Sequence, residues 1–242
     1  MVNTACGRLA LLAPNGIHFL VDPDHWDPLI LEHALAANAT TPVNTLIVGG
    51  TYIHGTNFDE VMKTCKRTLK CVGTFLTAGP VDTVLSPLAD FLVVPLAIGS
   101  GNTRFITDHV IAAAATIERY GMPCVRVAYL QLDGGRSTSA AFFTQVLPIP
   151  RGKPEIVRTM SLVGRLLGVD AIYLEAGSDA IVSASVEEIR AAVEGGDGLP
   201  VLVGGGIKTQ QQCASAFAAG ARGIVIGSAF EQRGGTAWLA TP

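Results

Sequence analysis

The chain has 242 residues, of which 49% are hydrophobic, and its formal net charge is −3. This apolar content excludes an intrinsically disordered protein. We expect no nucleic-acid partner, because that binding needs clustered cations against phosphates and the sequence has no run of Lys or Arg.

Eight short apolar segments recur along the chain, each followed by small polar residues. In chain order they are IHFLV (17–21), TLIVG (45–49), CVGTFL (71–76), FLVVP (91–95), CVRVAYLQL (124–132), AIYLE (171–175), VLVGG (201–205) and GIVIG (223–227). Nearly continuous apolar character is typical of parallel strands that are covered on both faces.

Helical patterns separate several of these segments. They run from about Phe105 to Tyr120, from Pro154 to Leu167, from Ser185 onward and from Thr209 to Gly220. Ser185 and Thr209 each precede a Glu or Gln by three residues, which is the pattern of a capping box. Alternating strands and helices without a linker predict one (β/α)8 TIM-type barrel, a single domain over residues 1–242.

Two glycine turns follow the seventh and eighth predicted strands, in GGGIKT and GSAF. Loops at these positions often hold phosphate in such barrels, and glycines let backbone N–H groups approach its oxygens. We therefore predict an anion site at Gly204, Gly205, Gly227 and Ser228. The alternative is two tight turns that bind nothing.

Two carboxylates follow the first predicted strand, in VDPDH, and Thr51 follows the second. Asp22 and Asp24 suit a hard cation such as Mg²⁺, which takes one or two protein carboxylates together with substrate phosphates. The alternative is that both side chains cap the next helix.

The stretch YLEAGSDA (173–180) ends the sixth predicted strand. Tyr173 and Glu175 are two residues apart, so both side chains point to one face. A buried carboxylate costs free energy unless it has partners, and we expect those partners to be ligand hydroxyl groups. The alternative is an ion pair with Lys or Arg. Gly177 and Ser178 allow the following loop to fold over a ligand.

The five cysteines are Cys6, Cys65, Cys71, Cys124 and Cys213. Their odd number and the lack of CxxC spacing argue for a reducing compartment and against zinc or a disulfide framework. No apolar run approaches the roughly 20 residues of a membrane span, and the N-terminus does not resemble a signal peptide. We therefore expect a cytoplasmic protein, with room for contact with a membrane surface. We also expect a homo-oligomer.

The motifs VDPDH, VGGT, YLEAGSDA, VGGGIKT and the late GS, in this order, resemble those of the geranylgeranylglyceryl phosphate synthase family, which includes the bacterial heptaprenylglyceryl phosphate synthases. The similarity covers about the whole chain. The resemblance implies a prenyltransferase that joins a prenyl diphosphate to the terminal hydroxyl of sn-glycerol 1-phosphate with magnesium.

Carried over by motif, the resemblance assigns Asp22 and Thr51 to Mg²⁺, and Glu175 and Tyr173 to catalysis. It assigns two segments to the glycerol phosphate: Tyr173, Leu174, Glu175, Ala176, Gly177, Ser178 and Asp179, and then Gly204, Gly205, Gly227 and Ser228.

Three segments depart from the family pattern: His25 stands where Lys is usual, FLTAGP replaces FPG, and IGSGNTR replaces an Asn-Ser-x-Asn-Pro stretch. All three belong to the side that binds the prenyl donor. Two alternative functions therefore stay open: a phosphate-binding barrel with another acceptor such as 3-phosphoglycerate, and a glycerol phosphate-binding barrel without catalysis.

Overall fold

Eight parallel strands close into a barrel in which each strand pairs with the next along the chain and β8 pairs with β1. This computed structural model describes residues 6, 8–37, 43–55, 57–69, 71–77 and 84–227. The strands are β1 (Gly16–Val21), β2 (Thr45–Val48), β3 (Val72–Phe75), β4 (Phe91–Ala97), β5 (Cys124–Gln131), β6 (Ala171–Glu175), β7 (Val201–Gly204) and β8 (Gly223–Ile226). The predicted (β/α)8 barrel is thus confirmed, and every predicted strand segment holds one of these strands.

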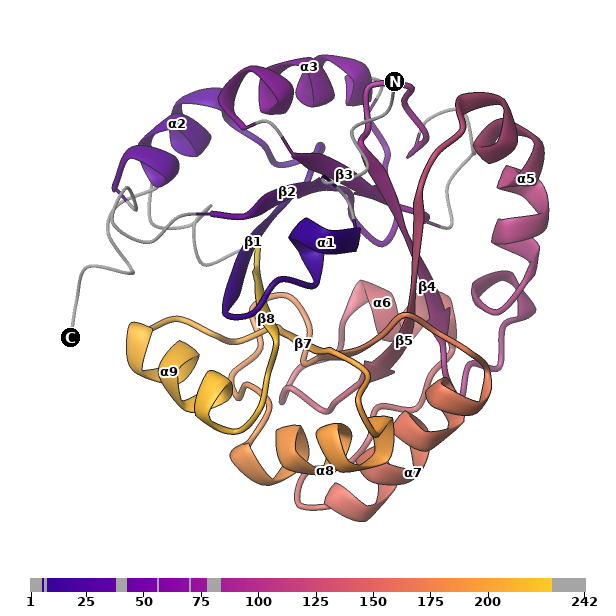
Figure 1. Cartoon of the computed structure of the whole chain (residues 1–242), viewed down its shortest axis with the longest axis vertical. Coiled ribbons are helices and arrows are strands. Elements are labelled where there is room, and N and C mark those ends of the chain that lie inside the picture. The colour runs from indigo at the N-terminus through magenta and orange to yellow at the C-terminus, as the bar shows by residue number, and fades with distance from the viewer. Residues whose placement is uncertain are drawn as a thin grey trace.

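Helices surround the barrel, as Figure 1 shows. They are α1 (Arg8–Leu11), α2 (Pro28–Ala37), α3 (Phe58–Thr68), α5 (Asp108–Tyr120), α6 (Ser139–Thr144), α7 (Pro154–Leu166), α8 (Val186–Gly196) and α9 (Gln210–Ala218). Both predicted capping boxes are confirmed, at Ser185 with Glu188 and at Thr209 with Gln212.

The helix predicted from Phe105 begins later, at Asp108. A short 3₁₀ turn, Thr103–Phe105, occupies the preceding residues, because the side chain of Asn102 accepts a hydrogen bond from the N–H of Arg104 and ends the strand-to-helix loop there. The sequence pattern had not indicated α1 or α6, which are too short to show a helical period.

Two apolar cores lie on opposite faces of the sheet. Residues such as Phe19, Ala128 and Leu174 pack toward the helices, whereas Val127, Tyr173 and Leu202 belong to a second cluster of alternate strand residues that fills the barrel. Leu11 of α1 is fully buried in this second cluster, and Figure 1 shows α1 across the near end of the barrel. The α1 segment therefore closes the end of the barrel where the strands begin.

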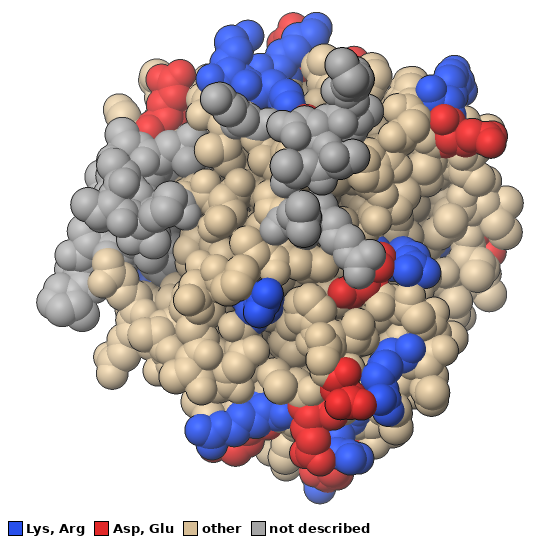
Figure 2. All heavy atoms as spheres, in the orientation of Figure 1, with Lys and Arg blue, Asp and Glu red and all other residues tan. Residues whose placement is uncertain are grey.

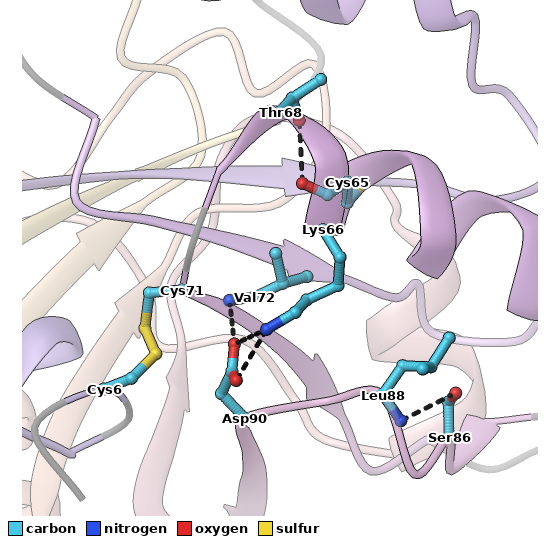
Figure 3. A network of polar contacts seen from close by, with 9 residues as sticks. All are labelled: Cys6, Cys65, Lys66, Thr68, Cys71, Val72, Ser86, Leu88 and Asp90. Atoms are coloured by element: carbon cyan, nitrogen blue, oxygen red, sulfur yellow. Dashed lines mark hydrogen bonds and ion pairs between the residues drawn. A yellow bond between two sulfur atoms is a disulfide. The ribbon is translucent and has the colours of Figure 1, made fainter. Parts of the chain in front are cut away.

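A disulfide joins Cys6, before α1, to Cys71, before β3 (Figure 3), whereas the cysteine pattern had argued for a reducing compartment and against a disulfide framework. The pairing escaped prediction because the two cysteines are 65 residues apart and meet only when the N-terminal segment closes the barrel. Beside them, the Asp90 carboxylate accepts hydrogen bonds from the Lys66 ammonium and from the N–H of Val72 (Figure 3). Cys65, Cys124 and Cys213 are free thiols.

The face that carries α1 has most of its charged side chains near the rim, as Figure 2 shows. Two ion pairs join α7 to α8, Arg158 with Glu194 and Arg165 with Asp197.

Among the described residues, no helix combines the length and the apolar character needed to cross a membrane.

Candidate active site

The carboxylate of Glu175 lies at the end of β6, inside the barrel mouth, and is 9% exposed. As the alternation predicts, Tyr173 points to the same face, and its hydroxyl donates to Glu175 Oε2 at 2.5 Å. The N–H of Gly177 donates to Glu175 Oε1 at 2.6 Å. Each carboxylate oxygen has a second lone pair, so both can still accept a ligand hydroxyl.

Burial raises the pKa of Glu175, and the hydrogen bonds from Tyr173 and Gly177 oppose this rise. No cation pairs with Glu175 among the described ion pairs. Burial and the nearby charge of Glu175 raise the pKa of Tyr173 well above its usual value, so the phenol remains a hydrogen-bond donor. A buried carboxylate with a raised pKa is suited to accept a proton near neutral pH.

Two glycines after β7 make room for this carboxylate. A Cβ atom on Gly204 would lie 2.5 Å from both Glu175 Oε2 and the Tyr173 hydroxyl. A Cβ atom on Gly205 would lie 2.5 Å from Glu175 Oε1 and from the N–H nitrogen of Gly177, and its φ of +77° also favours glycine. Only glycine therefore fits at both positions. The sequence had suggested phosphate binding as the reason for these glycines, and the structure adds the space that the Glu175 carboxylate needs.

The predicted phosphate residues are partly brought together. Gly204 and Gly205 lie against Glu175, and Gly227 follows β8, the strand next to β7. Ser228 lies outside the described residues.

The remaining residues of the predicted glycerol phosphate segment have different placements. Leu174 packs toward the helices, so its side chain does not face the barrel mouth. Ala176 is buried, and its N–H donates to the carbonyl of Gly204. Ser178 is exposed, while Asp179 is half-buried with a φ of +56°. The segment thus curls from the end of β6 toward the end of β7.

The predicted magnesium residues come from adjacent loops after β1 and β2. The Asp22 carboxylate lies 3.4–3.5 Å from where a Cβ atom of Gly50 would be, next to Thr51. Its Oδ1 accepts from the N–H of Asp24, and its Oδ2 lies 3.3 Å from His25 Nδ1. A partly exposed carboxylate fits Mg²⁺, which takes one or two protein carboxylates and its other ligands from substrate phosphates and water.

Asp24 has a different role from Asp22. Its two oxygens accept from the N–H groups of His54 and Gly55, each at 2.7 Å, so Asp24 ties the β1 loop to the β2 loop. The helix α2 is capped instead by Asp27, whose carboxylate accepts from the N–H of Leu29. The alternative in which both Asp22 and Asp24 cap the next helix is therefore wrong.

The described residues of the three departures from the family pattern lie at or after the ends of β1, β3 and β4. His25 contacts Asp22 through a largely exposed side chain. Of FLTAGP, the described part ends at Thr77. In IGSGNTR, the hydroxyl of Ser100 donates to the carbonyls of Asn102 and Thr144 and so holds this loop to α6.

Sequence reasoning missed two residues beside Glu175. Tyr129 and Gln131 on β5 face the same barrel interior, and they pair in register with Tyr173 and Glu175. The ring of Tyr129 lies edge-on to that of Tyr173, with centroids 5.5 Å apart. The signal was present in the sequence, since YLQ on the fifth strand repeats the spacing of YLE on the sixth.

Comparisons with known proteins agree with this fold. The sequence model of the PcrB family matches residues 16–240. A geranylgeranylglyceryl phosphate synthase of Spirosoma linguale is 30% identical over 88% of this chain and 84% of its own, and one of Thermococcus gammatolerans is 34% identical over 90% and 85%. The crystal structure of the Thermoplasma acidophilum synthase in complex with its substrate sn-glycerol-1-phosphate has a TM-score of 0.77, covers 90% of this chain and 86% of its own, and is 23% identical, a likeness of fold.

Proposed function

The chain belongs to the PcrB family, and on this premise we propose that it is a prenyltransferase of lipid biosynthesis. It transfers a prenyl group from a prenyl diphosphate to the terminal hydroxyl of sn-glycerol 1-phosphate and so forms an ether lipid precursor. The observation that carries this proposal is the Glu175 carboxylate, which is buried at the barrel mouth with hydrogen-bond donors but pairs with no cation among the described residues.

The reaction forms one bond between carbon and oxygen and breaks another. The terminal oxygen of the acceptor attacks the allylic carbon, and the diphosphate leaves with the electron pair of the broken bond. Glu175 accepts the proton of the attacking hydroxyl through a free lone pair, a task favoured by its raised pKa. Tyr173 donates its one hydroxyl proton to Glu175 Oε2 and holds it in place, so it can bond the phosphoglycerol only by accepting from one of its hydroxyls.

The phosphate of the acceptor binds at Gly204, Gly205, Gly227 and Ser228, where backbone N–H groups supply the donors. The fit of Gly204 and Gly205 against Glu175 supports this arrangement, because it fixes the distance between an anion site after β7 and the proton acceptor on β6. Such fixed geometry is what converts binding energy into rate.

Mg²⁺ held by Asp22 and Thr51 would supply the positive charge that stabilises the leaving diphosphate. The carboxylate of Asp22 is fixed by the N–H of Asp24, and Asp24 in turn holds the β2 loop that carries Thr51. The donor therefore occupies the β1–β2 side of the mouth and the acceptor the β6–β7 side.

The substrates are small molecules, and the prenyl donor is a lipid. We further propose contact with a membrane surface, a cytoplasmic location and a homo-oligomer. Exposed apolar side chains in the segments that follow the strands support the membrane contact, among them Tyr52 and Ile181 in loops and Phe142 on α6.

A direct test is an assay with labelled prenyl diphosphates of several lengths and with sn-glycerol 1-phosphate or 3-phosphoglycerate as acceptor. We expect ether formation with sn-glycerol 1-phosphate and dependence on Mg²⁺. Transfer to 3-phosphoglycerate alone would favour the other acceptor, and binding of sn-glycerol 1-phosphate without any transfer would favour the non-catalytic barrel that the His25 departure leaves open.

A further inference from the structure

Strand β5, which lies next to β6, ends in a sequence of three residues nearly identical to the one that ends β6. Tyr129, Leu130 and Gln131 of β5 pair in register with Tyr173, Leu174 and Glu175 of β6. Gln131 is 2% exposed and, like Glu175, is an interior-facing residue at the end of its strand. An amide at this position avoids a second buried carboxylate beside Glu175, which would be costly.

The carboxamide of Gln131 connects the strand to the loop that follows it. Its Nε2 donates to the hydroxyl oxygen of Thr138 at 2.6 Å. The same oxygen accepts from the N–H of Ala141 and so caps α6. The carboxamide oxygen of Gln131 is buried and has no hydrogen-bond partner in the part of the chain that the structure describes.

The loop between β5 and α6 interlocks with the loop after β6. The methyl group of Thr138 occupies the space that a Cβ atom on Gly177 would need. A Cβ atom on Gly134 would likewise clash with the carbonyl oxygen of Ala176, and the carbonyl of Gly134 accepts from the N–H of Ile181 at 2.8 Å. Gly177 is the residue whose N–H holds Glu175 Oε1.

A chain of contacts therefore leads from Gln131 through Thr138 and Gly177 to the carboxylate of Glu175. We propose that Gln131 and Thr138 are positioning residues that hold the Gly177 turn, and with it Glu175, in the geometry that binds the acceptor. The proposal rests on the proposed function, since it takes sn-glycerol 1-phosphate as the ligand of this turn.

The buried oxygen of Gln131 separates this role from a merely structural one. An unsatisfied buried acceptor lowers stability, so Gln131 is a poor choice for stability alone. Gln131→Leu should keep or raise the melting temperature and still weaken acceptor binding. If Gln131 served only packing, Gln131→Leu would lower the melting temperature and leave acceptor binding unchanged.

The experiment compares wild type with Gln131→Leu, Thr138→Val and Thr138→Ser. Thr144→Val is the matched control, because Thr144 is a buried threonine of α6 whose hydroxyl bonds the carbonyl of Ala140 and the N–H of Val146. Three quantities are measured: Kd for sn-glycerol 1-phosphate by calorimetry without donor, KM for each substrate, and hydrogen exchange of residues 177–179 without ligand.

We expect Gln131→Leu and Thr138→Val to raise the Kd and the KM for the acceptor about tenfold, the loss of one hydrogen bond, with the KM for the donor unchanged. Exchange at 177–179 should speed up in both variants. Thr138→Ser keeps the hydroxyl bonded by Gln131 but removes the methyl group that lies against Gly177, so exchange at 177–179 should speed up in this variant as well. Thr144→Val should change only the melting temperature.

Two outcomes would overturn the proposal: unchanged exchange at 177–179 in Thr138→Val, or an equal loss of acceptor affinity in Thr144→Val. The proposed function is judged separately. A wild-type protein that binds sn-glycerol 1-phosphate but transfers no prenyl group refutes the transfer reaction, while the Kd and exchange values still decide the role of Gln131 and Thr138.

Discussion

The two ends of the barrel are built from the same strands but differ in chemistry. Where the strands end, the interior carries Asp22, Gln131 and Glu175, and glycines leave space around the polar groups. Where the strands begin, the interior is closed by α1 and by the disulfide between Cys6 and Cys71. Figure 1 shows α1 over that end.

The difference shows how one barrel separates binding from stability. At the end with Glu175, polar atoms keep free lone pairs for a ligand. At the other end, the polar residue His18 is fully buried beside Thr45, away from the mouth. Substitutions at the first end should therefore alter rate, and substitutions at the second should alter the free energy of unfolding.

Among the substitutions that test this comparison, Glu175→Gln should have the largest effect on turnover. The variant keeps the shape of the side chain but loses the charge that accepts the proton, so turnover should fall by about 10² to 10⁴. Its melting temperature should stay the same or rise, because a buried charge is removed. Both values are measured on one preparation by steady-state kinetics and calorimetry.

Glu188→Gln is the matched control for that prediction. Glu188 is also buried, but it pairs with Arg151 at 2.9 Å and completes the capping box of α8. This substitution should lower the melting temperature and leave the rate per folded molecule near that of wild type. A Glu175 variant that behaved in the same way would make Glu175 a structural residue.

Much of the end with Glu175 could be predicted from the sequence. Local periodicity gives the strand β6, and a period of two residues places Tyr173 and Glu175 on one face. The capping boxes of α8 and α9 were readable for the same reason, because their hydrogen bonds join residues three apart.

Contacts between distant segments could not be predicted. The disulfide depends on how residues before α1 cross the barrel. The tie from Asp24 to His54 spans 30 residues, and the fit of Gly177 against Thr138 depends on the register of β5 with β6. In each case, the spacing along the chain holds no information about the distance in space.

Removal of the disulfide tests the end of the barrel where the strands begin. Closing a loop of 65 residues lowers the entropy of the unfolded chain, which corresponds to roughly 4 kcal/mol of stability. Cys71→Ser should therefore lower the free energy of unfolding substantially, as measured by denaturant titration. At a temperature where the variant stays folded, kcat/KM should remain close to that of wild type.

Cys124→Ser is the control, because Cys124 is an exposed free thiol. It should change neither stability nor rate. If Cys71→Ser instead abolished activity in the folded protein, the two ends of the barrel would be coupled and the separation proposed above would be wrong.

Asp22→Asn divides the mouth into its donor and acceptor sides. The substitution removes the charge expected to bind Mg²⁺ while keeping an oxygen for the N–H of Asp24. Affinity for the metal and for the prenyl diphosphate should fall by at least about tenfold. Calorimetric titration with sn-glycerol 1-phosphate should give a Kd near that of wild type, and full turnover in excess chelator would contradict the magnesium assignment.

The smallest expected effect concerns His18, at the end where the strands begin. Its Nδ1 lies 2.9 Å from the Thr45 hydroxyl, and its Nε2 is buried with no partner among the described residues. Burial lowers the pKa of His18 from 6.5 to about 3. Between these values the unfolded chain binds a proton that the folded barrel does not, so stability is lost as the pH falls.

From pH 7 to pH 5.5, this one group should reduce the free energy of unfolding by about 1 kcal/mol. Other groups also titrate in this range, so the measured quantity is the difference between wild type and His18→Gln, which cannot gain a proton. Denaturant titrations at both pH values should show a smaller loss in His18→Gln than in wild type. Because His18 lies away from the mouth, kcat/KM at pH 7 should be unchanged in His18→Gln. A parallel loss of activity in His18→Gln would show that this end of the barrel also shapes the site.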